Sequence, residues 1–355
     1  MKIGLIPPNS NTGEFKYCQY LYRGLIERGL EVKLLNNRFL VNRPNLKIFL
    51  GSFLLKRMVN DDIEILHNVD NLGPFLFGDS DSKMKRVLTV HDIAPIIFPD
   101  IHNRMMKFDF KYILPKLIEN SDLIIADSYF TKKDLERYFK VKEDKVNVAH
   151  LGVNSSFFYP RENNGEVMAK YGIKNDYLFY LGNDNPRKNL KNLILAYSRI
   201  YKEIGEDLVL VGPINQGNLR AFIEKIDKGN GLSDRVITPG YVDYDDLPPL
   251  YSGATSLVFT SLYEGFGFAP LEAMACGTPV ITSNNSSITE VVGDAGVFID
   301  DPLNPEEISN KISLLLNNEN LQKKLKLQGP KRAKKFSWDN TIDKTLEAYE
   351  KVYEA

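Results

Sequence analysis

Short apolar runs rich in Val, Ile and Leu alternate along the chain with longer amphipathic segments. In the first half these runs predict strands, and the segments with a 3.6-residue apolar spacing predict helices. The predicted strands are Lys2–Ile6, Glu31–Leu35, Ile63–His67, Val87–His91, Leu123–Ala126 and Val146–His150, and the predicted helices include Glu14–Arg28 and Thr131–Phe139. Such alternation indicates a parallel sheet with helices on both faces.

A polar segment, Pro160–Gly172, interrupts this pattern, and the alternation then starts again. The second set of predicted strands is Tyr177–Leu181, Leu208–Val211, Val236–Thr238, Leu257–Thr260 and Val280–Thr282. The helices predicted with them are Asn189–Ile204, Leu219–Lys228, Asp245–Ser252, Pro270–Cys276, Pro305–Asn317 and Asp339–Tyr353. We therefore predict an α/β protein with two Rossmann-like, doubly wound domains, residues 1–160 and 161–338, facing each other across a cleft. In such sheets, ligands bind beyond the carboxyl ends of the strands.

The composition narrows the class of protein. The chain has 355 residues, of which 43% are hydrophobic and 26% charged, as is typical of a globular protein of about two domains. Lys and Arg number 45 against 46 for Asp and Glu, so the bulk charge gives no indication of a nucleic-acid partner. Cys18 and Cys276 form neither a disulfide framework nor a zinc motif. The short apolar N-terminus and the lack of a long apolar run predict a cytoplasmic protein without a transmembrane helix.

The densest group of candidate site residues lies in Ser261–Gly277, which reads SLYEGFGFAPLEAMACG. Glu264 falls in a glycine-containing loop after a predicted strand, and Glu272 is expected in the first turn of the helix that Pro270 begins. Exposed N–H groups at that helix start favour an anion, and both carboxylates accept hydrogen bonds from hydroxyl groups. A sugar nucleotide carries both kinds of group. The alternative is that Glu272 only complements the helix dipole and that Glu264 is solvated.

A basic pair, Arg187 and Lys188, follows the first strand of the second half in the run GNDNPRKN. Arginine offers two parallel donors and lysine a mobile point charge, so together they suit a diphosphate. Cations are disfavoured at a helix start unless an anion joins them. A solvated pair is the alternative interpretation.

The first half contributes two further candidates. His91 ends a predicted strand, where it could hydrogen-bond a sugar hydroxyl or assist at the reacting centre, and Gly13 lets a phosphate approach the backbone of the first loop. The alternatives are a structural histidine and a plain turn glycine. That loop has no G-x-G-x-x-G, which counts against a dinucleotide oxidoreductase. Tyr129–Lys133, in a helix that Thr131 is expected to cap, is a candidate acceptor contact.

The sequence EGFG at 264–267, followed by Glu272 and by AMACGTPVI at 273–281, resembles the signature of the retaining glycosyltransferases of family 4, which have the GT-B fold. Residues 287–295 (SITEVVGDA) and 336–338 (FSW) also fit that family, so the resemblance covers nearly the whole chain. It implies transfer of a sugar from a nucleoside diphosphate to an acceptor hydroxyl, with retention of configuration and without a metal. It also implies that the C-terminal helix, residues 339–355, crosses back to the first domain.

The resemblance further implies roles for individual residues. Glu264 is expected to contact the donor sugar or its phosphate side, and Glu272 the ribose hydroxyls. Arg187 and Lys188 are expected to hold the leaving diphosphate and to form, with Glu264 and with His91 near the donor sugar, the catalytic group. The other expected donor contacts are Gly13, Tyr241, Val242, Leu262, Tyr263, Gly265, Phe266, Gly267 and Phe268.

Substrates and partners are predicted as classes only. We expect a UDP- or GDP-sugar donor, a sugar, lipid-linked or small-molecule acceptor, no cofactor and no nucleic acid. Asp79-Ser80-Asp81 is interpreted as a solvated turn rather than a metal site. The segments Ile48–Met58 and Met105–Lys107 add an expectation of peripheral contact with the inner face of a membrane. Two alternatives stay open: another GT-B enzyme, such as a sugar-nucleotide epimerase or a phosphorylase, and a non-enzymatic sugar-binding protein.

Overall fold

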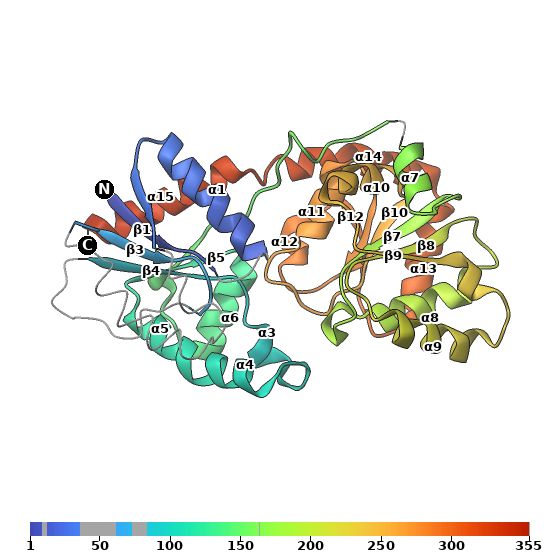
Figure 1. The fold of residues 1–355 in the computed structure, drawn as a ribbon, viewed down its shortest axis with the longest axis horizontal. Coiled ribbons are helices and arrows are strands. Elements are labelled where there is room, and N and C mark those ends of the chain that lie inside the picture. The colour runs from blue at the N-terminus through green and yellow to red at the C-terminus, as the bar shows by residue number, and fades with distance from the viewer. Residues whose placement is uncertain (9–12, 36–61, 73–83, 163, 355) are drawn as a thin grey trace. The chain divides into compact units, whose positions relative to one another are not determined.

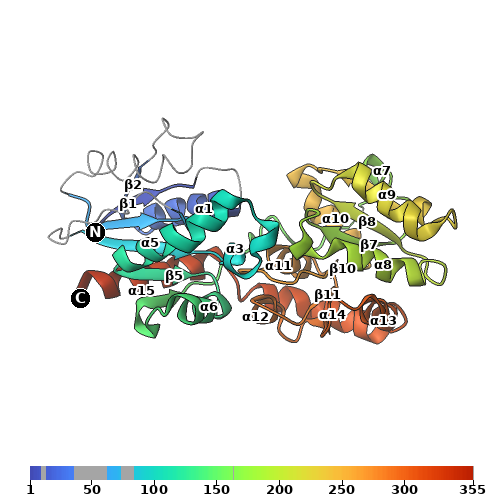
Figure 2. The same cartoon turned by 90° about the horizontal axis from the view of Figure 1, so that it is seen from below.

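The computed structural model describes residues 1–8, 13–35, 62–72, 84–162 and 164–354. The segment Ile48–Met58 and the Asp79–Asp81 turn lie outside these residues. The chain forms two compact units: residues 1–152 with 336–355, called unit 1 below, and residues 153–335, called unit 2. Each contains one parallel sheet (Figures 1 and 2), which confirms the predicted α/β class.

The described residues of unit 1 form six strands in the order β2-β1-β3-β4-β5-β6, every neighbouring pair parallel. They are β1 Lys2–Ile6, β2 Glu31–Leu34, β3 Ile65–Asn68, β4 Lys85–Val90, β5 Leu123–Ala126 and β6 Val146–Val148. The helices are α1 Gly13–Glu27, α3 Ala94–Ile97, α4 Arg104–Phe108, α5 Leu114–Asn120, α6 Tyr129–Phe139 and α15 Trp338–Glu354, with a π-helical turn, η3, at Asp109–Ile113. Helices α1 and α15 cover one face of the sheet, and α5 and α6 cover the other (Figure 1).

The C-terminal helix α15 is built into unit 1 by close contacts. The ring of Trp338 stacks on Tyr20 at 4.3 Å between centroids. His67 is fully buried in β3, and its Nδ1 is hydrogen-bonded to the hydroxyl of Tyr349 at 2.6 Å. Burial lowers the pKa of His67 to about 3, so the imidazole is neutral. Gly152 meets the start of α15 so closely that a Cβ there would lie 2.2 Å from the backbone nitrogen of Trp338.

Unit 2 also has six parallel strands, in the order β12-β11-β10-β7-β8-β9. They are β7 Tyr177–Leu181, β8 Asp207–Val211, β9 Val236–Gly240, β10 Ser256–Phe259, β11 Val280–Ser283 and β12 Gly296–Ile299. The helices are α7 Gly165–Lys170, α8 Leu190–Ile200, α9 Gln216–Asp227, α10 Leu247–Gly253, α11 Phe268–Ala275, α12 Ile288–Val292, α13 Pro305–Leu316 and α14 Glu319–Ala333. Helices α8 and α13 lie on one face, and α10, α11 and α14 on the other (Figure 1).

The eleven predicted strands are all present, with ends shifted by up to two residues. The analysis missed β12 and several helices, and the segment interpreted as a polar passage contains the short helix α7. Helix α14 escaped detection because its buried stripe is Leu325, Gly329 and Ala333, in which two of the three side chains are too small to give an apolar signal. Small residues are needed there because a Cβ on Gly329 would lie 3.1 Å from the carbonyl oxygen of Met274 in α11.

The contact between Gly152 and α15 generates a stability prediction. Gly152→Ala forces the added methyl group against backbone atoms, which give way less easily than a side chain, so we expect a loss of about 1–3 kcal/mol in the free energy of unfolding. Thermal and denaturant unfolding measure the change. Gly165→Ala, where a Cβ meets nothing within 4 Å, is the control and should unfold like the unmodified protein. Equal stability of the two variants would contradict the tight packing at Gly152.

Candidate active site

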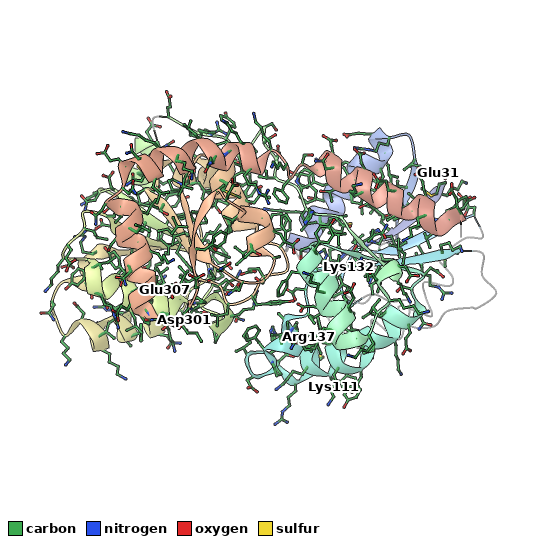
Figure 3. All side chains as sticks on the ribbon, turned by 180° about the vertical axis from the view of Figure 1, so that it is seen from behind. Glu31, Lys111, Lys132, Arg137, Asp301 and Glu307 are labelled. Carbon is green, nitrogen blue, oxygen red and sulfur yellow. The ribbon has the colours of Figure 1, made fainter. Side chains whose placement is uncertain are left out.

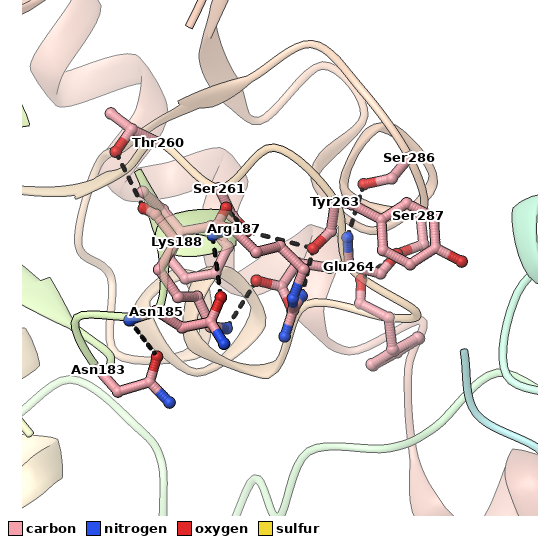
Figure 4. Close-up of polar contacts among 12 residues, drawn as sticks. Asn183, Asn185, Arg187, Lys188, Thr260, Ser261, Tyr263, Glu264, Ser286 and Ser287 are labelled. Carbon is pink, nitrogen blue, oxygen red and sulfur yellow. Dashed lines mark hydrogen bonds and ion pairs between the residues drawn. The ribbon is translucent and has the colours of Figure 1, made fainter. Parts of the chain in front are cut away.

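Three charged side chains form a cluster in unit 2. Strands β7 and β10 are parallel neighbours, so their carboxyl ends lie side by side. The turn after β7 carries Arg187 and Lys188, and the loop after β10 carries Glu264. Lys188 Nζ donates to Glu264 Oε1 at 2.6 Å and Arg187 Nη1 donates to Glu264 Oε2 at 2.9 Å (Figure 4). The guanidinium also donates to the carbonyl of Tyr263.

The electrostatics of this cluster favour a further anion. Glu264 is only 9% exposed, and burial by itself would raise its pKa. Lys188 and Arg187 outweigh that effect and hold the pKa of Glu264 at about 2, so the carboxylate is ionised at neutral pH. Two cations against one carboxylate leave a local charge of +1 in a largely buried place. An excess charge of this kind attracts an anionic group such as a diphosphate.

The loop that carries Glu264 is fixed by the segment after β11. The backbone N–H of Glu264 donates to Ser286 Oγ at 3.1 Å, and Ser287 Oγ donates to the carbonyls of Glu264 and Phe266 at 2.7 and 2.8 Å (Figure 4). Gly267 then adopts a φ of +114°, which other residues rarely reach, just before α11 begins. The position of the carboxylate is therefore set before any ligand arrives.

The other donor-contact candidates after β10 are built into this loop. The backbone N–H of Leu262 donates to the carbonyl of Arg187 at 2.8 Å, which ties the two loops together. The side chains of Tyr263 and Phe266 are buried, and Phe268 and Leu262 are half-buried. Gly265 and Gly267 are buried as well. These side chains therefore pack largely inside the unit.

Glu272 lies elsewhere on the helix than the sequence analysis expected. Helix α11 begins at Phe268 rather than at Pro270, because Gly267 ends the loop two residues earlier, so Glu272 is in the second turn and not the first. Its Oε2 accepts a hydrogen bond of 2.9 Å from the hydroxyl of Tyr251, a fully buried residue of α10. The sequence analysis did not single out Tyr251, because a tyrosine in an amphipathic helix gives the same signal as any core residue.

Two further candidates lie at the same edge of the sheet. Tyr241 and Val242 follow β9, which is two strands away from β7 in the sheet order. Gly240 turns the chain there with a φ of +78° and accepts a hydrogen bond of 2.9 Å from Gly212 N. The ring of Tyr241 is 79% exposed. The candidates of unit 2 thus lie along one carboxyl edge, from β10 through β7 to β9.

Unit 1 has an ion pair at the corresponding edge of its own sheet. His91 follows β4 and Asp127 follows the neighbouring strand β5. Their Nδ1 and Oδ2 atoms are 2.6 Å apart, and His91 Nε2 donates to the carbonyl of Val69 at 3.0 Å. Since a carbonyl only accepts, Nε2 carries a proton, and the second proton lies between Nδ1 and Asp127. Burial alone would lower the pKa of His91, but Asp127 raises it to about 10.

Asp92, the sequence neighbour of His91, is not the residue that pairs with the imidazole. Asp92 Oδ1 accepts from the backbone N–H of Ala94 at the start of α3, whereas the partner of the imidazole is Asp127. The cap of α6 also differs: Ser128, not Thr131, accepts the hydrogen bond, and Thr131 is buried with its hydroxyl donating to the carbonyl of His91 at 3.3 Å. Thr131 therefore supports the backbone of His91.

The remaining candidate of unit 1 is Gly13. It is exposed and is the first residue of α1. Among the described residues, no group of three or more His, Cys, Asp or Glu side chains is placed to hold a metal ion. No helix within the described ranges is both long and apolar enough to cross a membrane.

The fold and the site together define a class of protein. The structure is similar to that of sucrose-phosphate synthase from Thermosynechococcus elongatus, with a TM-score of 0.81 and 21% identity over 100% of this chain and 99% of that one. It is also similar to Anabaena Alr3699/HepE in complex with UDP-glucose, with a TM-score of 0.79 and 16% identity over 99% and 100%. The fold is thus GT-B, as predicted.

The family follows from the sequence comparisons. Residues 163–332 match Glycosyl transferases group 1, and residues 13–157 match Glycosyltransferase Family 4. The chain is 32% identical over 281 residues to O-antigen chain mannosyltransferase B of Escherichia coli, covering 75% of this chain and 70% of that protein. It is 29% identical over 279 residues to the serotype-specific mannosyltransferase WbdA of the same organism, covering 76% of this chain but only 34% of WbdA. The chain belongs to glycosyltransferase family 4, the glycosyl transferases of group 1. It is a retaining enzyme that uses a nucleotide-sugar donor.

The state of His91 is directly measurable. In the unmodified protein we expect the imidazole to stay protonated well above neutral pH, because Asp127 accepts from it. Asp127→Asn removes the charge but leaves the burial, so the pKa of His91 should fall below its ordinary value of about 6.5. Nitrogen NMR of the imidazole follows this titration.

Asp92→Asn is the matched control, since Asp92 Oδ1 accepts from the Ala94 backbone, and it should leave the titration unchanged. Because the folded pKa lies above the unfolded value, the pair stabilises the fold fully below about pH 6.5 and this contribution is lost as pH rises through about 10. A His91 ring that loses its proton near pH 6.5 in the unmodified protein would show that Asp127 does not hold it.

Proposed function

We propose that the enzyme transfers a hexose, mannose in particular, from UDP or GDP to a hydroxyl of a growing polysaccharide. Several relatives are mannosyltransferases, one of an O-antigen chain. A structural neighbour was solved with UDP-glucose. The observation that carries the proposal is the Lys188–Glu264–Arg187 cluster with its excess positive charge.

The leaving group of the reaction is a nucleoside diphosphate, on which negative charge develops as the bond to the sugar breaks. Arg187 and Lys188 suit it because Glu264 already orients both cations before the donor binds. Preorganised donors of this kind typically contribute about 10²–10³ in rate each. They supply the charge stabilisation for which other enzymes use a divalent cation.

The other candidates receive roles from their positions. Glu272, held by Tyr251, is proposed to accept from the ribose hydroxyls, and the backbone of residues 240–242 and 262–268 to line the nucleoside and the sugar. Gly13 is proposed to lie near the donor phosphates and His91 near the sugar. We further propose that unit 2 holds the nucleotide and that unit 1 holds the acceptor.

The chemistry of His91 bears on the proton transfer. Both of its ring nitrogens already donate, to Asp127 and to the Val69 carbonyl, so the ring has no lone pair with which to take a proton. His91 is therefore proposed not to act as a base but to donate a hydrogen bond from Nε2 to a sugar oxygen in place of the Val69 carbonyl. The acceptor proton then passes to an oxygen of the departing phosphate, and attack on the same face of the sugar preserves the configuration.

A set of three variants tests the proposal. Lys188→Ala, Glu264→Ala and Glu272→Ala should each lower turnover with a mannosyl nucleotide by about 10²-fold or more, because each removes a contact to the leaving group or the nucleoside. Arg220→Ala, which breaks the exposed pair with Glu224 in α9, should be unaffected. Near-normal turnover in all three variants, with folding intact, would remove the basis of the proposal.

Two simple measurements separate the alternatives. A sugar-binding protein would bind free mannose well and a nucleoside diphosphate poorly in calorimetry, whereas the proposed enzyme does the reverse. A sugar-nucleotide epimerase would convert the donor without any acceptor. Parallel titrations with UDP and GDP identify the base.

The hydrogen bond from Tyr251 to Glu272 gives a sharper prediction. Tyr251→Phe removes only the hydroxyl, so it deletes this hydrogen bond to Glu272 without emptying the core. We expect the affinity for the nucleoside diphosphate to fall about ten- to a hundredfold, as for the loss of one buried hydrogen bond to a charged group. Affinity for the 2′,3′-dideoxy nucleotide should not change, because that ligand has no ribose hydroxyls. An equal loss for both nucleotides would show that Tyr251 acts only on stability.

A further inference from the structure

Residues 104–120 of unit 1 form a helical segment that is apolar on two sides. It consists of α4, the π-helical turn η3 and α5, which follow each other without a break. One side belongs to the core: Phe110, Ile113, Leu114, Leu117 and Ile118 are buried in one hydrophobic cluster under the sheet. A surface helix normally presents polar residues on its other side.

The opposite side of this segment carries large apolar side chains in the open. Met105, Phe108 and Tyr112 are three and four residues apart and are 42%, 49% and 49% exposed. The rings of Phe108 and Tyr112 contact each other with centroids 5.0 Å apart. These three residues are called the outer stripe below. Exposed apolar side chains that cluster in this way are typical of interaction surfaces.

Basic residues surround the outer stripe. Residues 104–120 contain four cations, Arg104, Lys107, Lys111 and Lys116, against two acids. One of those acids, Asp109, is buried, and burial raises its pKa; the other, Glu119, is exposed. Lys111 lies at the free margin of the segment, with its Nζ 5.3 Å above the ring of Tyr112 (Figure 3). The segment is thus locally cationic in a chain whose net charge is −1.

We propose that this side of α4, η3 and α5 docks on an anionic lipid surface. Met105, Phe108 and Tyr112 enter the boundary between headgroups and acyl chains, and the long basic side chains reach back to the lipid phosphates. A segment of 17 residues at 1.5 Å per residue gives about 25 Å of helix to lie along the membrane. The proposal is independent of sugar transfer, because it concerns binding to the surface alone.

Charge favours lipid over a second copy of the chain as the occupant. In a symmetric dimer the same patch would face itself, so Arg104, Lys107, Lys111 and Lys116 would meet their own counterparts. Like charges placed opposite one another across an interface are unfavourable. A membrane rich in anionic phospholipid presents the opposite sign over the whole length of the segment.

Vesicle co-sedimentation of the full chain tests the proposal. We expect binding to vesicles of phosphatidylcholine with 30% phosphatidylglycerol to exceed binding to pure phosphatidylcholine by about tenfold, and to weaken as salt screens the cations. Phe108→Ser with Tyr112→Ser should lower the affinity about tenfold through the loss of apolar burial. Lys107→Gln, Lys111→Gln and Lys116→Gln together should abolish the preference for phosphatidylglycerol.

Helix α14 supplies the matched control, since it carries exposed lysines around a single exposed apolar residue, Leu327. Lys323→Gln, Lys324→Gln and Lys326→Gln remove the same charge from that helix and should leave vesicle binding unchanged. Unfolding curves and calorimetry with a nucleoside diphosphate confirm that each variant is folded, and calorimetry also keeps this test separate from the proposed function.

Three outcomes would overturn the proposal. The first is equal binding to the neutral and the anionic vesicles. The second is an equal loss in the α14 control. The third is a dimer in light scattering that Phe108→Ser with Tyr112→Ser dissociates, which would make the outer stripe a contact between copies.

Discussion

The carboxylate of Glu264 between Arg187 and Lys188 is the interaction on which the site of unit 2 depends. It exists because β7 and β10 are parallel neighbours, which brings the two loops that carry these residues together. One carboxylate fixes two cations that would otherwise repel each other, and it leaves one positive charge unbalanced. The sheet order therefore decides the electrostatics, and the electrostatics decide which ligand the edge accepts.

At the carboxyl ends of neighbouring strands, the two units carry groups of charged side chains that differ in net charge. In unit 1, the carboxyl ends of β4 and β5 carry His91 and Asp127. The imidazolium and the carboxylate form a hydrogen-bonded ion pair that is neutral overall. In unit 2, the equivalent arrangement of neighbouring strands carries a cluster with a net charge of +1. A diphosphate is attracted by the second and not by the first, which is the physical argument for assigning the nucleotide to unit 2.

The sequence predicted every described strand except β12 and singled out the three charged residues of the cluster, but not the groups that hold them. Strands show a strong apolar signal, and Glu264, Arg187 and Lys188 stand next to glycines and prolines that mark loops at strand ends. Asp127 and Tyr251 gave no such signal, because a partner brought in by another strand or helix has no fixed spacing from the residue it contacts. The start of α11 was misplaced for a related reason: Gly267, not Pro270, ends the preceding loop.

The cluster also accounts for the presence of a glutamate in a site that is proposed to bind an anion. A carboxylate repels a diphosphate, so its removal could be thought to improve binding. Without Glu264, however, Arg187 and Lys188 would be two largely buried cations without this compensating carboxylate, and such groups either leave their positions or destabilise the unit. The depressed pKa of Glu264 has the same origin, since the carboxylate is ionised to compensate the cations rather than the ligand. The glutamate costs some attraction for the diphosphate and in return keeps both donors in the geometry that the leaving group requires.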